Sequence, residues 1–217
     1  MQEVLIIGSG AVSAELVMYI DDHNRHVPYT DQFEVMGFIE YEENRNKYWS
    51  KYNHKKPIVG DLDTFDFDQN INVLIAMGNV GYRSQIIDML KNKSIHTNFI
   101  HYSTMVDETV ELGCGNIIYP QCIVGPQAVI GNWNLITSFS FISHDCRIGE
   151  NNVMSTAGLA GHVLVGNNNM FGIRSTCLPG ISIGSNNVIQ AGMIVDKSIS
   201  DGFTVFHRYK EKIILGN

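Results

Sequence analysis

The feature that most constrains this chain is an apolar residue at every sixth position through its second half. These residues are Val106, Leu112, Ile118, Val124, Ile130, Ile136, Ile142 and Ile148, then, after a slip of one residue, Val165, Phe171, Cys177, Ile183, Ile189 and Val195. Six residues suffice for one short strand and one tight corner, and three hexads complete one coil of a parallel β-helix. A β-sandwich would instead space its strands by about 8 to 12 residues. The sequence therefore predicts a β-helix.

The residues between the apolar positions fit the corners of such coils. Glycine follows many of the apolar residues, and pairs or runs of asparagine occur at 151–152, 167–169 and 186–187. Both residue types tolerate the positive φ values that tight corners require. Four cysteines, Cys114, Cys122, Cys146 and Cys177, lie within the repeat without a C-x-x-C pair. We expect them to be free thiols that fill the core.

The first hundred residues follow a different pattern, in which apolar strands alternate with helices. Strands are predicted at 4–7, 35–39, 58–59, 73–77 and 97–101, and helices at 11–20 and 83–91. This alternation predicts a small parallel sheet of Rossmann type. The polar segment 41–56 is expected to be a surface loop. We predict an α/β Rossmann-like domain over residues 1–103, followed by an all-β domain over residues 104–217.

Charge and hydropathy exclude several classes of protein. The formal charge of −7 argues against a general affinity for nucleic acid or for an anionic membrane, because both require a basic surface. No apolar run approaches the roughly 18 to 20 residues that span a bilayer. The opening MQEVLIIGSG lacks the basic end and the cleavage site of a signal peptide. We therefore expect a cytoplasmic protein.

Several motifs resemble the sialic acid O-acetyltransferase and nucleotide-sugar N-acetyltransferase family of hexapeptide-repeat acyltransferases. They are VLIIGSGAVSAELV, PIVGDLDTF, VLIAMGNVGYR, the repeat itself, FISHDCRIGENN and GLAGHVLVG. The resemblance implies a left-handed β-helix, a homotrimer, acetyl-CoA as cosubstrate and no metal. It also implies N-acetylation of a UDP- or dTDP-linked 4-amino-4,6-dideoxy sugar in the biosynthesis of a bacterial surface polysaccharide or glycoprotein. The nucleotide and the stereochemistry of the sugar stay open.

His144 is the candidate general base. It lies two positions beyond the inward-facing Ile142, outside the predicted core, and imidazole titrates in the range that a general base needs. Asp145 would orient the ring, and Gly161 matches a family position whose backbone N–H faces the thioester carbonyl. Two departures are visible: some relatives carry a second histidine where this chain has Val153, and the segment 154–159 is one residue short.

Further candidates would bind the two substrates. Gly8, Ser9 and Gly10 form a glycine turn at a helix N-terminus, where a diphosphate can approach the backbone. Glu40 matches a family position that contacts the nucleotide, and Gly78, Asn79 and Arg83 follow the fourth strand, where Arg83 could pair with phosphate. By family position, coenzyme A would contact Ile173, Ala191, Gly192 and Lys197. For Glu40 and Arg83, ordinary surface positions are an open alternative.

Three alternative functions are also compatible with the sequence. The first is O-acetylation of a sugar, as in the sialic acid branch of the family. The second is a non-catalytic binder of sugar nucleotides. The third is a zinc enzyme of the γ-carbonic anhydrase type, since His144 and His162 are one coil apart, although a third suitably placed histidine is missing from the coils.

Overall fold

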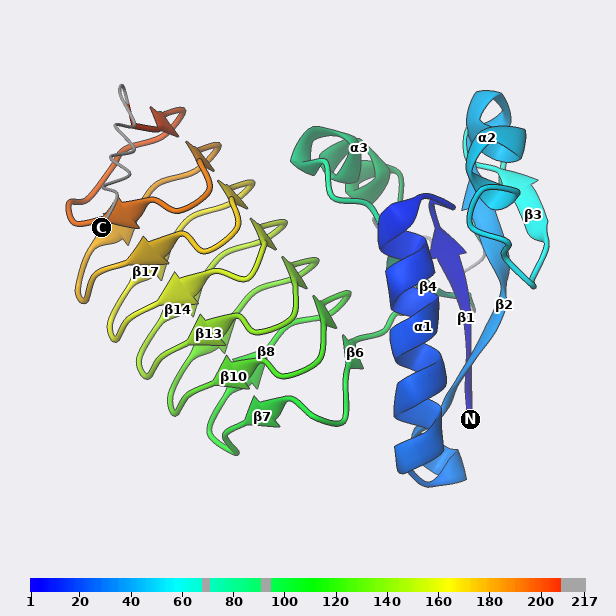
Figure 1. The fold of residues 1–217 in the computed structure, drawn as a ribbon, viewed down its shortest axis with the longest axis horizontal. Helices are drawn as coiled ribbons and strands as arrows, with labels where there is room; N and C mark the ends of the chain where they lie inside the picture. The colour runs from blue at the N-terminus through cyan, green and yellow to red at the C-terminus, as the bar shows by residue number, and fades with distance from the viewer. Residues whose placement is uncertain (68–70, 91–94, 208–217) are drawn as a thin grey trace, which may run out of the picture.

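The computed structural model describes residues 1–67, 71–90 and 95–207 and shows an α/β sheet domain beside a parallel β-helix (Figure 1). The sheet has five parallel strands in the order β3-β2-β1-β4-β5. They are β1 (Gln2–Ile7), β2 (Phe33–Glu40), β3 (Ile58–Asp61), β4 (Asn72–Ile75) and β5 (Ile95–His96). Helices α1 (Ala11–His26) and α3 (Val80–Leu90) connect strands of the sheet. None of the helices in the described ranges is long and apolar enough to cross a membrane.

The connection between β2 and β3 is more ordered than the surface loop predicted for residues 41–56. It contains a 3₁₀ helix, η2 (Glu42–Asn44), and a short α-helix, α2 (Arg45–Trp49). Another 3₁₀ helix, η1 (Tyr29–Asp31), precedes β2. His54 is buried and its Nε2 lies 2.9 Å from the carbonyl oxygen of Ser9, so the connection is fixed to the glycine turn after β1. The loop prediction was wrong because this buried contact joins residues far apart in the chain.

Two-residue strands build the three parallel sheets of the β-helix (Figure 1). The first sheet contains β7 (Met105–Val106), β10 (Ile123–Val124), β13 (Phe141–Ile142), β16 (Gly158–Leu159), β19 (Thr176–Cys177) and β22 (Ile194–Val195). The second contains β8 (Glu111–Leu112), β11 (Val129–Ile130), β14 (Arg147–Ile148), β17 (Leu164–Val165) and β20 (Ser182–Ile183). The third contains β6 (Phe99–Ile100), β9 (Ile117–Ile118), β12 (Leu135–Ile136), β15 (Val153–Met154), β18 (Met170–Phe171), β21 (Val188–Ile189) and β23 (Thr204–Val205).

The inward positions of these strands are those of the six-residue repeat, which confirms the predicted parallel coils. Side chains such as Ile130, Ile148 and Cys177 form one buried cluster along the interior. The one-residue slip in the repeat is also present in the structure. Residues paired across neighbouring coils are normally 18 apart, as for Ile123 and Phe141, but Phe141 pairs with Gly158, 17 residues on. All four cysteines are free thiols, as expected. Cys122, Cys146 and Cys177 lie in this buried cluster, whereas Cys114 is only partly buried and lies outside it, so its predicted place in the core was wrong.

Asparagines stabilise one edge of the β-helix from inside. Asn116, Asn134, Asn152, Asn169 and Asn187 are all buried at the corner between the second and third sheets. Each of the first four side-chain oxygens accepts the backbone N–H of the equivalent asparagine one coil later, at 2.9 Å from Asn152 to Asn134, and Asn187 accepts the N–H of Phe203 at 2.7 Å. The ladder satisfies corner N–H groups that the strands leave unpaired.

The two domains share a hydrophobic interface. Leu16 and Ile20 of α1 belong to the same buried cluster as Ile117, Leu135 and Val153 on the outer face of the third sheet. The strand predicted over residues 97–101 is therefore wrong in part, because β6 pairs with β9 and belongs to the β-helix. The β-helix therefore begins with β6 at residue 99, before the domain boundary that we expect after residue 103.

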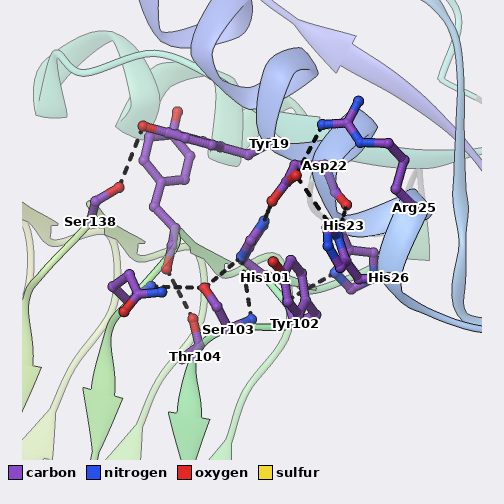
Figure 2. Close-up of polar contacts among 12 residues, drawn as sticks. Tyr19, Asp22, His23, Arg25, His26, His101, Tyr102, Ser103, Thr104 and Ser138 are labelled. Carbon is purple, nitrogen blue, oxygen red and sulfur yellow. Dashed lines mark hydrogen bonds and ion pairs between the residues drawn. The ribbon is translucent and has the colours of Figure 1, made fainter.

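A group of histidines lies where the C-terminal end of α1 meets the first coil, as Figure 2 shows. His101 is buried, and its Nε2 lies 3.3 Å from Oδ2 of Asp22 without a well-aligned hydrogen bond. Its Nδ1 lies 2.9 Å from Oγ of Ser103. The Tyr102 backbone N–H donates to Nδ1 of His23 at 3.0 Å. Hydrogen bonds of His23 and contacts of His101 therefore connect the two domains at this point.

We expect the free energy of unfolding to fall as the pH drops from about 7 to about 5. Burial lowers the pKa of His101 below its ordinary value of 6.5, although the Asp22 carboxylate opposes the shift. The unfolded chain therefore takes up a proton at this residue at a higher pH than the folded chain does. The stabilisation is complete above pH 6.5 and is lost as the pH falls towards the folded pKa, by at most about 1.4 kcal/mol per pH unit.

Urea denaturation between pH 7.5 and pH 5 measures this dependence. His101→Gln should have a shallower slope than the wild type, while the exposed His207→Gln should keep the wild-type slope. An unchanged slope in His101→Gln would rule out this residue as the source.

Candidate active site

The candidate base lies at the corner between the first and second sheets. Gln127, Asp145, His162 and Gly180 occupy equivalent positions of successive coils there, with φ between 58° and 74°. Backbone hydrogen bonds hold the stack together, including His162 N–H to the His144 carbonyl oxygen at 3.1 Å. Left-handed residues at a β-helix corner turn the chain sharply and direct their side chains outward. Two histidines and one aspartate from adjacent coils thus meet on the outside of the β-helix.

His144 and Asp145 form a hydrogen-bonded pair. Nδ1 of His144 lies 2.8 Å from Oδ2 of Asp145. Because a carboxylate only accepts, Nδ1 carries the proton and Nε2 presents a lone pair. This hydrogen bond lowers the pKa of Asp145 below its ordinary value of 3.8, and His162 lowers it further. Asp145 is therefore ionised at neutral pH and holds His144 in the tautomer that accepts a proton at Nε2.

Gly161 lies directly against the His144 ring. A Cβ atom at residue 161 would stand 2.6 Å from Cε1 and 2.7 Å from Nε2 of His144, closer than real Cβ contacts. Any larger residue at 161 would therefore displace the imidazole. The predicted role of the Gly161 N–H towards a thioester carbonyl stays a prediction.

A hollow of about 320 Å³ lies beside Asp145, but His144 is not among the residues that line it. It is lined by Gln127, Asp145, Arg147, His162 and Leu164. The sequence pattern does not indicate Gln127 or Arg147, and it indicates His162 only as a zinc ligand. Two counts along the sequence could have indicated them. Gln127 lies 18 residues, or one coil, before Asp145. Arg147 lies two residues after Asp145 and points outward from β14.

The residues expected to contact coenzyme A do not all share this corner. Ile173, Ala191 and Gly192 lie at the corner between the third and first sheets, where Gly192 N–H donates to the Ile173 carbonyl oxygen at 2.8 Å. Lys197 follows β22 and is exposed. Within one chain, the first sheet therefore separates the three corner residues from His144. Their contact with coenzyme A stays a prediction.

A second pocket, of about 510 Å³, lies at the carboxyl ends of β1, β2 and β4. It is lined by Gly8, Gly10, Ala11, Val12, Glu40, Tyr41, Glu43, Asn44, Tyr48, Tyr52, Ala76, Met77, Gly78, Asn79 and Tyr82. Five of the predicted substrate-binding residues, Gly8, Gly10, Glu40, Gly78 and Asn79, are among them. The tyrosines were not predicted, because three of them come from the segment we had expected to be a loop.

Glu40 holds the glycine turn in place. Its Oε2 accepts the Ser9 backbone N–H at 2.7 Å and the Ser9 hydroxyl at 2.8 Å, and its Oε1 accepts the Tyr41 N–H at 2.9 Å. Both Ser9 and Glu40 are buried. Ser9 therefore does not line the pocket itself, but its hydrogen bonds to Glu40 fix the glycine turn that does. A contact between Glu40 and a nucleotide stays a prediction.

The structure contradicts the phosphate contact predicted for Arg83. Its side chain is fully buried, and burial lowers its pKa to about 10, so it is charged at neutral pH. The guanidinium donates to the carbonyl oxygens of Ile75 at 2.6 Å and Met77 at 3.1 Å, to Asn151 Oδ1 at 3.0 Å and to the Trp133 carbonyl oxygen. Arg83 joins the two domains and does not face the pocket.

Anion binding in this pocket would therefore depend on the backbone. None of the described residues that line it is a lysine or an arginine, and Glu40 and Glu43 contribute carboxylates. Helix α1 begins beside the pocket with Gly10 as N-cap, no side-chain cap and no acidic residue in its first turn. The first N–H groups of a helix are unpaired within the helix and carry partial positive charge. They are the donors available to a phosphate group.

Comparison with known proteins starts from sequence. No family model matches the chain. It is 34% identical over 88 residues to YvoF of Bacillus subtilis, a protein named as an acetyltransferase, and this match covers 40% of the chain and 44% of YvoF. It is 28% identical over 116 residues to an acyl-[acyl-carrier-protein]–UDP-N-acetylglucosamine O-acyltransferase of Sinorhizobium fredii, covering 48% of the chain and 43% of the relative. The chain thus spans less than half the length of the curated relatives it matches.

Solved structures match almost the whole chain. PerB from Caulobacter crescentus, in complex with CoA and GDP-perosamine, has a TM-score of 0.78 at 22% identity and covers 94% of this chain and 93% of its own. The acetyltransferase domain of PglB from Neisseria gonorrhoeae has a TM-score of 0.76 at 18% identity, with 94% and 96% coverage. At this level of identity the match shows a shared fold, with the sheet domain and the β-helix in the same arrangement.

Proposed function

We propose that this chain is an acetyl-CoA-dependent N-acetyltransferase acting on the amino group of a nucleotide-linked 4-amino-4,6-dideoxy sugar. The observation that carries the proposal is the His144–Asp145 pair, which presents a free Nε2 on the outer corner of the β-helix. The pocket at the carboxyl ends of β1, β2 and β4 would hold the nucleotide. The step belongs to a cytoplasmic pathway for a bacterial surface polysaccharide or glycoprotein.

The reaction follows from the chemistry of this pair. The neutral amine of the sugar attacks the thioester carbonyl carbon, and His144 Nε2 takes the proton that the nitrogen loses. The Asp145 carboxylate stabilises the resulting imidazolium through Nδ1–H. When the C–S bond breaks, the imidazolium returns the proton to the thiolate of coenzyme A. The Gly161 N–H would stabilise the oxyanion, a type of contact worth about 2.7 to 4 kcal/mol.

The known proteins support the class of substrate. PerB was solved with CoA and GDP-perosamine, and the PglB acetyltransferase domain with acetyl coenzyme A. The resemblance found in the sequence points to UDP or dTDP, whereas PerB binds a GDP sugar. UDP, dTDP and GDP therefore all stay candidates for the nucleotide. The proposal specifies only the amino sugar that is attached to it.

We propose a homotrimer whose donor sites lie between neighbouring β-helices. The outer face of the first sheet exposes Met105, Ile123, Phe141 and Ile194, which a partner could cover. This face lies between the corner of His144 and that of Ile173. If two subunits pack here, His144 of one and Ile173 of the next can border the same coenzyme.

An acceptor screen tests the function. Purified protein is mixed with acetyl-CoA and UDP-, dTDP- or GDP-linked 4-amino-4,6-dideoxyhexoses, and thiol release is followed together with the mass of the sugar nucleotide. We expect stoichiometric transfer of one acetyl group to at least one amine. Transfer to an analogue with a hydroxyl group at C4, but not to the amine, would indicate an O-acetyltransferase. Unconsumed acetyl-CoA with every acceptor would indicate a binder.

A further inference from the structure

The same corner carries a set of metal ligands that the acetyltransferase reaction does not require. His144, Asp145 and His162 each offer one ligand atom, and these three atoms lie within 4.8 Å of one another. The carboxylate is shared: Asp145 Oδ2 lies 2.8 Å from Nδ1 of His144 and 3.8 Å from Nε2 of His162. The two imidazole rings are 5.1 Å apart and nearly perpendicular, at 87°.

We propose that His144, Asp145 and His162 bind a divalent ion of the Zn²⁺ type and that this ion inhibits the enzyme. Two imidazole nitrogens, one carboxylate oxygen and a water molecule form a tetrahedral ligand set common at zinc sites. Ligand atoms of such a site lie roughly 3.3 Å apart, given bonds of about 2.0 to 2.1 Å. The two separations from the carboxylate oxygen, 2.8 and 3.8 Å, lie on either side of that value. The three ligand atoms span up to 4.8 Å, so the imidazole nitrogens would have to move closer together on binding.

The surroundings allow this adjustment. The three side chains are 54%, 43% and 66% exposed, so they can rotate and a water molecule can reach the fourth position. Asp145 and His162 occupy the same corner position on adjacent coils, which fixes their backbones one coil apart. Mg²⁺ prefers six oxygen ligands and should bind here far more weakly.

Inhibition follows from the position of the ring proton and depends on the proposed function. A metal bound to Nδ1 of His144 takes the place of the proton through which Nδ1 now donates a hydrogen bond to Asp145. The neutral ring then carries its proton at Nε2, where the amine of the sugar would have to deliver its own. The metal also occupies the carboxylate that would stabilise the imidazolium. Acetyl transfer should therefore stop in the metal-bound form.

Metal binding is tested apart from activity. Untagged, chelator-treated protein is titrated with Zn²⁺ by calorimetry and with Co²⁺ by visible absorption, which reports tetrahedral coordination. We expect one ion per chain, no comparable binding of Mg²⁺, and at least about tenfold weaker Zn²⁺ binding in His162→Gln. His207→Gln removes an exposed histidine elsewhere and should bind as the wild type does. Equal Zn²⁺ affinity in His162→Gln and the wild type would overturn the site.

The inhibition is tested on the wild type with its best acceptor. Acetyl transfer should fall in proportion to the fraction of chains that hold Zn²⁺, and a chelator should restore it. Full activity at saturating Zn²⁺ would overturn the inhibitory role even if the ion binds. If no acceptor is acetylated at all, the proposed function fails, and the calorimetry still decides whether the site exists.

Discussion

Replacing His144 with alanine is expected to lower kcat for acetyl transfer by at least about a hundredfold, the lower end for loss of a general base. The variant loses the Nε2 lone pair that would accept the proton of the amine. Asp145 cannot substitute for it, because a carboxylate with an ordinary pKa of 3.8 is a much weaker base than imidazole. The side chain of His144 is 54% exposed, so the fold should tolerate its removal. Initial rates at saturating acetyl-CoA measure the effect.

Two controls separate catalysis from structure. The thermal unfolding temperature of His144→Ala should stay close to that of the wild type, since no buried contact is lost. His207→Ala also removes an exposed imidazole and should keep the wild-type rate. A rate in His144→Ala within a few-fold of the wild type would show that another group takes the proton.

Much of the β-helix could be predicted because its information is local. Each coil repeats the same short strand and corner, so the spacing of Ile130, Ile136 and Ile142 alone indicates which side chains face the core. The one-residue slip could also be placed correctly, between Met154 and Leu159. His144 could be placed outside the core by the same count, since it lies two residues past an inward position.

The missed features depend on contacts between the two domains. Arg83 follows a strand at the start of a helix, a position that in a Rossmann-like sheet suggests a phosphate ligand. Its partners Trp133 and Asn151 come from the β-helix, 50 and 68 residues away, so no local sequence pattern predicts these contacts. Val153, where some relatives carry a second histidine, is buried in the cluster that also contains Leu16 and Ile20 of α1.

Replacing Arg83 with methionine is expected to lower the free energy of unfolding by at least about 3 kcal/mol. Methionine retains much of the volume of the side chain but donates no hydrogen bond. The carbonyl oxygens of Ile75 and Trp133 and the side-chain oxygen of Asn151 would then lose a buried donor, and each unpaired polar group costs about 1 to 3 kcal/mol. Urea denaturation followed by circular dichroism measures the loss.

Arg25→Met is the matched control for this experiment. Arg25 is exposed and pairs with Asp22 at 2.9 Å on the surface of α1, a kind of solvent-screened contact that contributes little to stability. The two variants remove the same charge, so a difference between them measures burial and hydrogen bonding at Arg83. Equal losses in both variants would mean that the Arg83 hydrogen bonds contribute no more than a surface ion pair. A much larger loss in Arg83→Met would show that this buried guanidinium stabilises the contact between the sheet domain and the β-helix.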